Sequence, residues 1–137
     1  MTQIDPINKA IKTKLLKALK SGKYKQIGNR LRQHVEKDQQ HMCLFGVLCD
    51  IYIEEQKKGS WRVIANKKDD ASGIVEYSFD LDKIHFVEQV PTEVAEWAGF
   101  TIVSIARLVT INDAECLNRR IGDFKKVIEA LEQWPTK

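Results

Sequence analysis

The chain contains one long apolar stretch, Met42-Cys43-Leu44-Phe45-Gly46-Val47-Leu48-Cys49-Asp50-Ile51-Tyr52-Ile53, in which ten of twelve residues are apolar. Periodicity alone does not separate a buried helix from a buried strand in so continuous a run. The flanks favour a helix, because polar residues precede the stretch, the charged residues 54–58 follow it, and Gly59 ends it. We therefore predict a helix of about four turns, apolar nearly all round, in the middle of the domain.

The length and composition place this helix in a small globular protein. The 137 residues suit one domain, 1–137, with 43% hydrophobic and 30% charged residues. The longest apolar run is about half of the ~20 residues that a membrane-spanning helix needs. The N-terminus also lacks the apolar segment of a secretory signal. The sequence therefore predicts a cytoplasmic protein with no membrane partner.

Local patterns predict further elements around the central helix. A carboxylate followed by a proline, Asp5-Pro6, begins an amphipathic helix that ends at Ser21-Gly22. Runs rich in β-branched and aromatic residues predict strands over 61–65 and 74–79 and a short third strand over 84–87. Another helix begins at Pro91 and ends at Gly99.

The C-terminal third is less uniform. Residues 100–111 are rich in β-branched side chains, which favours a short strand followed by a helical turn; a brief helix capped by Ser104 is the alternative. Asp123 caps an amphipathic last helix. The predicted fold class is α+β: the N-terminal and central helices pack on a small antiparallel sheet, and an amphipathic helix ends the chain.

The charge is distributed unevenly along the chain. Residues 1–35 hold nine basic side chains and one acid, a net charge of +8, whereas the remainder carries −5. Such a concentrated positive segment suggests an anionic partner, or else the solvated face of a helix.

A polar, glycine-punctuated connection in this basic segment is the candidate binding site. Backbone N–H groups at glycine turns beside cations can cradle an anion, and an aromatic ring can stack on a base. The same composition also describes an ordinary surface loop, and no Walker-type or dinucleotide glycine motif is present. The predicted ligand-binding residues are Lys20, Lys23, Tyr24, Lys25, Gln26, Arg30 and Arg32.

Metal, redox and catalytic signatures are weak. The three cysteines, Cys43, Cys49 and Cys116, have no zinc-type spacing, and we expect buried, reduced thiols. His34, Asp38 and His41 would share a face if residues 31–40 were helical, but two solvent-exposed histidines are the preferred interpretation. We predict no metal and no cofactor, and no catalytic residue is assigned.

Three pieces of the chain together resemble an uncharacterised family of small phage and bacterial proteins. The pieces are a basic leader over 18–26 with the pattern Ser-Gly-x-Tyr-x-Gln, the cysteine-containing segment 43–52, and a Pro-x-x-Val-x-x-Trp piece over 91–97 that leads to Asn112-Asp113. The ending over 124–129 also matches. The chain departs from the family at Leu44, where a second cysteine is common, and in a longer insert over 114–122. The resemblance implies a fold and a setting, and no activity.

Two functions therefore stay open from the sequence. The first is a non-enzymatic accessory protein that binds a nucleotide or nucleic acid through its basic segment. The second is a protein-interaction module, either a small inhibitor of a host defence protein or a structural homo-oligomer. An enzyme is the less favoured third alternative, because no nucleophile with a base and no open metal site is indicated.

Overall fold

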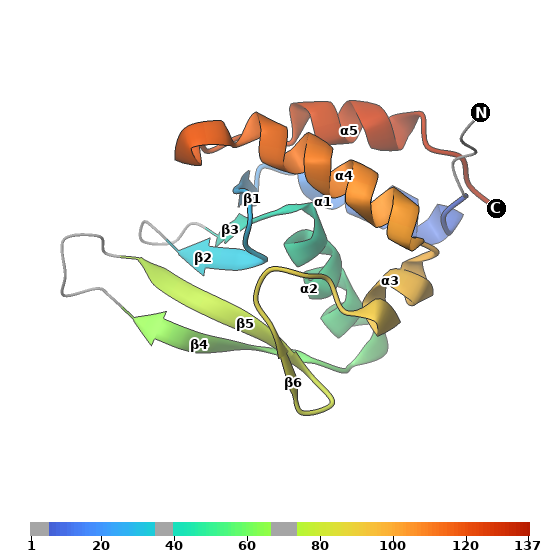
Figure 1. Ribbon diagram of the computed structural model, residues 1–137. Helices are drawn as coiled ribbons and strands as arrows, with labels where there is room; N and C mark the ends of the chain where they lie inside the picture. The colour runs from blue at the N-terminus through green and yellow to red at the C-terminus, as the bar shows by residue number, and fades with distance from the viewer. Residues whose placement is uncertain (1–5, 35–39, 67–73) are drawn as a thin grey trace.

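A computed structural model describes residues 6–34, 40–66 and 74–137 (Figure 1). The helices are α1 (Lys9–Lys20), α2 (Leu44–Gln56), α3 (Thr92–Ala98), α4 (Ile102–Glu115) and α5 (Lys125–Glu132), with one 3-10 turn, η1 (Leu117–Arg119). The strands are β1 (Tyr24–Gln26), β2 (Arg32–His34), β3 (Gln40–Met42), β4 (Ser60–Asn66), β5 (Val75–Leu81) and β6 (Ile84–Phe86). The predicted α+β class is confirmed.

Within the described residues, these strands form one sheet in the order β1-β3-β2-β5-β4, and β6 pairs with β5. β4 and β5 are the long antiparallel pair that the sequence predicted. β1 and β3 run parallel, so the sheet holds one parallel pair besides the antiparallel ones. β2 pairs with the start of β5 and β6 with its end. This arrangement brings the segment after β6 beside Leu31, whose N–H donates to the Val87 carbonyl at 2.8 Å.

The central helix is confirmed as α2, which lies between the sheet and the other helices (Figure 1). It is in contact with α1, α3, α4 and β3. Its first turns are buried on every side, because Leu44, Val47, Leu48 and Cys49 are all fully enclosed. A helix that is apolar all round is stable in water only when other elements cover it, and here they do.

The short strand predicted within residues 100–111 is wrong, because the chain forms α4 from Ile102 onward. Thr101 and Ser104 make a capping box: each side chain accepts a hydrogen bond from the backbone N–H of the other residue. These bonds satisfy N–H groups that a helix start leaves open, and they outweigh the modest β-propensity of the isoleucines and valines. The alternative of a helix near Ser104 was closer, although the observed helix is longer and begins after Thr101.

The ends of two other helices differ from their predicted positions. α1 begins at Lys9, where Asn8 Oδ1 accepts from the Ile11 N–H at 3.1 Å; the predicted cap, Asp5, lies outside the described residues. α5 begins after Phe124 rather than after Asp123. The Asp123 side chain still bonds the start of the helix, since its Oδ1 accepts from the Lys125 N–H at 3.2 Å. The next two N–H groups are satisfied by Glu115, whose Oε1 accepts from Lys126 N–H at 3.1 Å and from Val127 N–H at 3.2 Å.

The basic connection is not a surface loop throughout. Its middle is β1, which is tied to the C-terminal region by two hydrogen bonds between the Gln26 and Gly122 backbones, each 3.0 Å long. The helical alternative for residues 31–40 is also wrong where the structure describes them, because β2 and β3 occupy the two ends. His41 is 1% exposed, contrary to the expectation of a solvent-exposed histidine, and Asp38 lies outside the described residues.

In the described part of the chain, no helix by itself has the length and hydropathy needed to cross a membrane. α3 and α4 reach these values only when taken together, and the two are bent by 98°.

Candidate functional site

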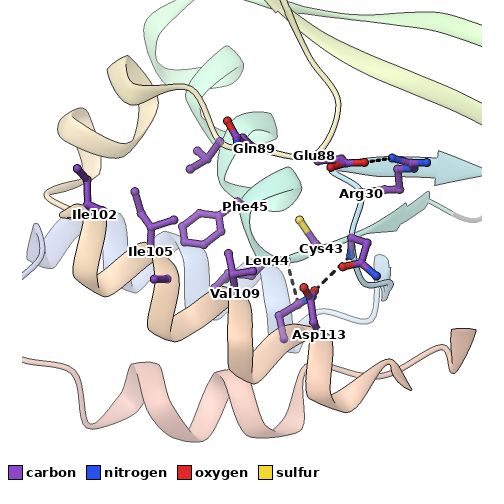
Figure 2. A pocket seen from close by; sticks show the side chains of 14 residues that line it. Arg30, Cys43, Leu44, Phe45, Glu88, Gln89, Ile102, Ile105, Val109 and Asp113 are labelled. Carbon is purple, nitrogen blue, oxygen red and sulfur yellow. Dashed lines mark hydrogen bonds and ion pairs between the residues drawn. The ribbon is translucent and has the colours of Figure 1, made fainter. Parts of the chain in front are cut away.

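A groove of about 450 Å³ lies between the start of α2 and one side of α4 (Figure 2). Its remaining walls are the segment after β1 and the segment between β6 and α3. The groove is lined by Asn29, Arg30, Cys43, Leu44, Phe45, Glu88, Gln89, Val90, Ile102, Ile105, Ala106, Val109, Asn112 and Asp113. We call it the α2–α4 groove. Its volume is in the range of sites that accommodate small ligands or side chains of a partner.

One part of the groove is apolar. Ile105 and Val109, one turn apart on α4, point toward Phe45 at the start of α2 (Figure 2). Phe45 is 2% exposed and held from behind by an edge-to-face contact with Phe100, with ring centroids 5.5 Å apart. The apolar wall is therefore made of residues that the core already holds in place.

The other part of the groove is polar. The Arg30 guanidinium forms an ion pair with the Glu88 carboxylate (Figure 2). Asp113 Oδ1 accepts from the Asn29 N–H at 3.2 Å and from Asn112 Nδ2 at 3.3 Å. The groove thus offers an apolar surface for contact and, at one end, charged groups that can orient a ligand.

Asn112 joins the elements that form the groove. Its Oδ1 accepts from the Leu44 N–H at the start of α2 and from Gln26 Nε2, both at 3.1 Å. Its Nδ2 donates to the Ile27 carbonyl oxygen at 2.9 Å. Asn112 is 2% exposed, so one buried amide bonds α2, α4 and the β1 region together. Its role here is to set the groove geometry.

Cys43 lies in the groove as the N-cap of α2. Burial raises the pKa of its thiol to about 12, although the N–H groups of Gly46 and Phe45 act in the opposite direction. Burial likewise raises the pKa of Cys116 to about 11 and that of Cys49 well above its ordinary value. All three thiols are free and buried, as the sequence predicted.

This chemistry gives a first test of the structure. Iodoacetamide at neutral pH is expected to label the native cysteines about a hundredfold or more slowly than a free thiol, because the thiolate is the reactive species. In urea all three cysteines should be labelled, with intact mass as the readout. Fast labelling of Cys43 alone in the native protein would contradict its burial and its raised pKa.

The outer surface of α4 beside the groove is apolar and exposed. Ile102 is 85% exposed, Val103 56% and Val109 37%, and two apolar side chains that follow the helix, Leu117 and Ile121, are 67% and 48% exposed. We call these five residues the α4 face. It holds five of the eight large hydrophobic side chains that are exposed in the described residues.

The charges of α4 are arranged so that this face is nearly uncharged. The helix contains three charged residues, Arg107, Asp113 and Glu115. Asp113 is directed to the Asn29 backbone and Glu115 to the start of α5, so both acids bond within the protein. Arg107 is the one exposed charged residue of α4, whereas Asp113 and Glu115 are half-buried.

The seven residues predicted to bind an anion do not share one site. Tyr24 and Gln26 are 6% and 0% exposed. The Tyr24 hydroxyl donates to Asp50, and Gln26 Oε1 accepts from the Phe124 N–H at 2.8 Å. Burial and the neighbouring Asp50 raise the pKa of Tyr24 well above its usual range, so it stays a neutral donor. Both side chains therefore have structural partners.

The cations of the predicted set are spread over several elements. Lys20 pairs with Glu132 on α5 at 3.0 Å, and Arg30 with Glu88. Lys23 and Lys25 are exposed around β1, with Lys23 Nζ 5.2 Å from the centroid of the Tyr24 ring. Arg32 is half-buried on β2. The groove contains Arg30 alone of the seven.

The α4 face and the groove were not predicted from the sequence. One signal was present: residues 102–112 contain a single charged residue, which is unusual for a helix on the surface of so charged a protein. Because we predicted a strand here, the lack of charge indicated a buried core strand and not an exposed apolar helix.

Comparison of the sequence with known proteins identifies the family to which the chain belongs. No curated protein matches the chain, and neither does any solved structure. The family described as Domain of unknown function (DUF8296) matches residues 7–133, which include every element from α1 to α5. The chain therefore belongs to the family described as Domain of unknown function (DUF8296).

Proposed function

We propose that the protein is a non-enzymatic binding protein that holds a segment of a partner protein on the α4 face and in the α2–α4 groove. The observation that carries this proposal is the set of exposed apolar side chains Ile102, Val103 and Val109 on α4, with Leu117 and Ile121 in the segment after it. Contiguous apolar surface on a soluble domain generally marks a site of interaction, whereas single exposed apolar residues need no explanation.

The groove supports the same proposal. Ile102 and Val109 belong both to the α4 face and to the groove, so an apolar side chain of a partner can enter the groove while its neighbours cover α4. Interfaces commonly combine a buried anchor in a pocket with a surrounding rim of polar contacts. Here the Arg30 and Glu88 pair lies at the polar end of the groove, in the position of such a rim.

Charge favours a partner of different sequence over a second copy. Arg107 lies one turn after Val103 on the exposed side of α4, so two antiparallel α4 helices packed through this side would bring two arginines toward each other. Like charges brought together in an interface oppose association. An amphipathic helix with apolar residues at i, i+3 or i+4 and i+7, and with a carboxylate opposite Arg107, meets both requirements.

The test is a selection from a displayed library of amphipathic helical peptides, followed by binding measurements on the selected peptides. Ile102→Asp is expected to weaken binding at least about tenfold, because it introduces a charge into the contact. The variant should fold normally, since Ile102 is 85% exposed. Thr13→Asp adds the same charge to an exposed position of α1 and should leave binding unchanged.

A charge exchange makes the test specific. Arg107→Glu should weaken peptides that carry a central acidic residue, and replacing that residue by lysine should restore the binding. Selected peptides that bind the Ile102→Asp variant as tightly as the wild type would contradict the proposal. A library that yields no peptide dependent on Ile102 would contradict it as well. A stable dimer that Ile102→Asp dissociates would assign the α4 face to a second copy.

A further inference from the structure

Arg32 lies in a second cluster of functional groups, formed by the sheet and α2. Its guanidinium carbon is 4.2 Å from the centroid of the Tyr77 ring on β5 and 5.3 Å from that of the Trp61 ring on β4. Its Nη2 donates to His34 Nε2 at 3.1 Å, which requires the tautomer with an unprotonated Nε2. The side chain thus reaches from β2 across β5 toward β4 and is held in place by aromatic rings.

This cation differs from the other arginines that line the sheet. Arg30 and Arg62 pair with carboxylates, Arg30 with Glu88 and Arg62 with Asp80 at 3.1 Å, whereas Arg32 forms no ion pair with a carboxylate of the described residues. Its Nε is buried and has no hydrogen-bond partner. Burial also lowers the pKa of Arg32 from its ordinary value. A partly desolvated cation without an anion is unfavourable and calls for an explanation.

The nearest acidic group is already engaged. Asp50 on α2 accepts from the Trp61 Nε1 at 3.2 Å through one oxygen and from the Tyr24 hydroxyl through the other. It acts on Arg32 only through its charge at a distance. Both of its oxygens are used by Trp61 and Tyr24, so Asp50 does not supply an acceptor to the Arg32 guanidinium.

We infer that Arg32, framed by Trp61 and Tyr77, is a binding site for a small oxyanion, the phosphate or carboxylate group of a ligand. A guanidinium presents parallel N–H donors that match two oxygens of such a group, and aromatic walls fix its orientation. Arg32 is half-buried rather than enclosed, so part of its side chain is open to solvent, whereas Nε itself is buried. The Lys23 ammonium lies 5.2 Å from the centroid of the Tyr24 ring, whose hydroxyl donates to Asp50.

The site is separate from the α2–α4 groove, since none of these residues lines it. The basic segment suggested that the protein binds an anion, and this site is a specific location for such binding at one of the predicted residues. Of the seven residues predicted from the sequence, Arg32 makes the proposed contact, and the Tyr24 hydroxyl bonds Asp50 beside it. The proposal for the groove and the inference for this site can therefore be contradicted independently of each other.

The test is a titration followed by NMR, with the Arg32 Nε–H and backbone amide signals as the readout. The probes are inorganic phosphate, acetate and adenosine monophosphate, each added to the full chain at constant ionic strength. We expect a saturable shift at Arg32. Arg32→Lys should weaken binding about tenfold, because the ammonium keeps the charge and loses the paired donors. Arg32→Gln should abolish it.

Arg62→Gln is the matched control, because Arg62 is another arginine of the sheet that already has a carboxylate partner, and this variant should bind as the wild type does. Preference for phosphate over acetate would identify the group, and tighter binding of the nucleotide than of phosphate would show that the aromatic rings contribute. If the wild-type protein shows no saturable shift at Arg32 with any of the three probes, the inference is overturned. This outcome is measured on the wild type, so it does not depend on how the variants fold. Equal binding by Arg32→Gln would overturn it too.

Discussion

Replacing Gly46 by alanine is expected to lower the free energy of unfolding by about 3 kcal/mol or more, which is the upper range for a group forced into a packed core. A Cβ at this position would overlap the carbonyl oxygen and carbon of Leu31 and would also lie 3.2 Å from Met42 Cβ. Leu31 is constrained at that point, because its carbonyl accepts from the Cys43 N–H at 3.3 Å and its own N–H donates to Val87. The backbone therefore cannot move aside without the loss of hydrogen bonds at the start of α2.

The measurement is urea unfolding followed by circular dichroism, with the slope of the transition compared between variants. Without a steric overlap, Gly46→Ala should stabilise α2, because alanine favours a helix over glycine by about 1 kcal/mol. A variant as stable as the wild type, or more stable, would therefore show that α2 and Leu31 are not in such close contact. Gly28→Ala is the control. Its Cβ would lie 3.3 Å from Asp113 Oδ1 and from Cys116 Cβ, a tight contact with side chains rather than with backbone. We expect its effect to be clearly smaller.

Replacing Asn112 by alanine is the second large change, with an expected loss of roughly 3 to 5 kcal/mol. The substitution leaves the Leu44 N–H and the Ile27 carbonyl without their side-chain partner in a buried region, and Gln26 loses one of its acceptors. Each buried polar group that loses its partner costs about 1 to 3 kcal/mol. Because these groups join α2, α4 and the β1 region, the groove should also lose its shape.

Thr110→Ala is the matched control on the same helix. Its hydroxyl donates to the Ala106 carbonyl at 2.9 Å on the exposed side, so its removal should change stability by no more than about 0.5 kcal/mol. The Asn112→Ala variant is compared with it by thermal and urea unfolding and by the binding of the selected peptides. Unfolding free energies that are equal for the two variants would contradict the joining role of Asn112.

Several elements were predictable because their signals are local. A few neighbouring residues are enough to indicate the type of these elements. They are the apolar run that forms α2, the apolar stripe of α5, and the strands β4 and β5. Pro91 and Gly99 likewise bracket α3 as its N-cap and C-cap. For such segments, period, propensity and capping residues agree, and tertiary structure changes only the ends.

Other elements were misassigned because local signals conflict or because the deciding partner is distant. In α4, the β-branched residues favour a strand, and the Thr101 and Ser104 capping box favours a helix. At β1, the polar side chains of Tyr24 and Gln26 suggest contact with a ligand. Their actual partners, Asp50 and Phe124, are 26 and 98 residues away along the chain. Whether a polar side chain faces a ligand or the core depends on contacts that a linear pattern does not contain.

The sequence by itself therefore determined the fold class, the buried central helix, the reduced cysteines and the uneven charge. The tertiary structure alone decided the candidate sites. The groove combines residues 29–30, 43–45, 88–90 and 102–113, and the Arg32 cluster combines three strands with α2. The physical reason is that secondary structure follows the local period of apolar residues, whereas a binding surface depends on which faces of distant elements remain uncovered after packing.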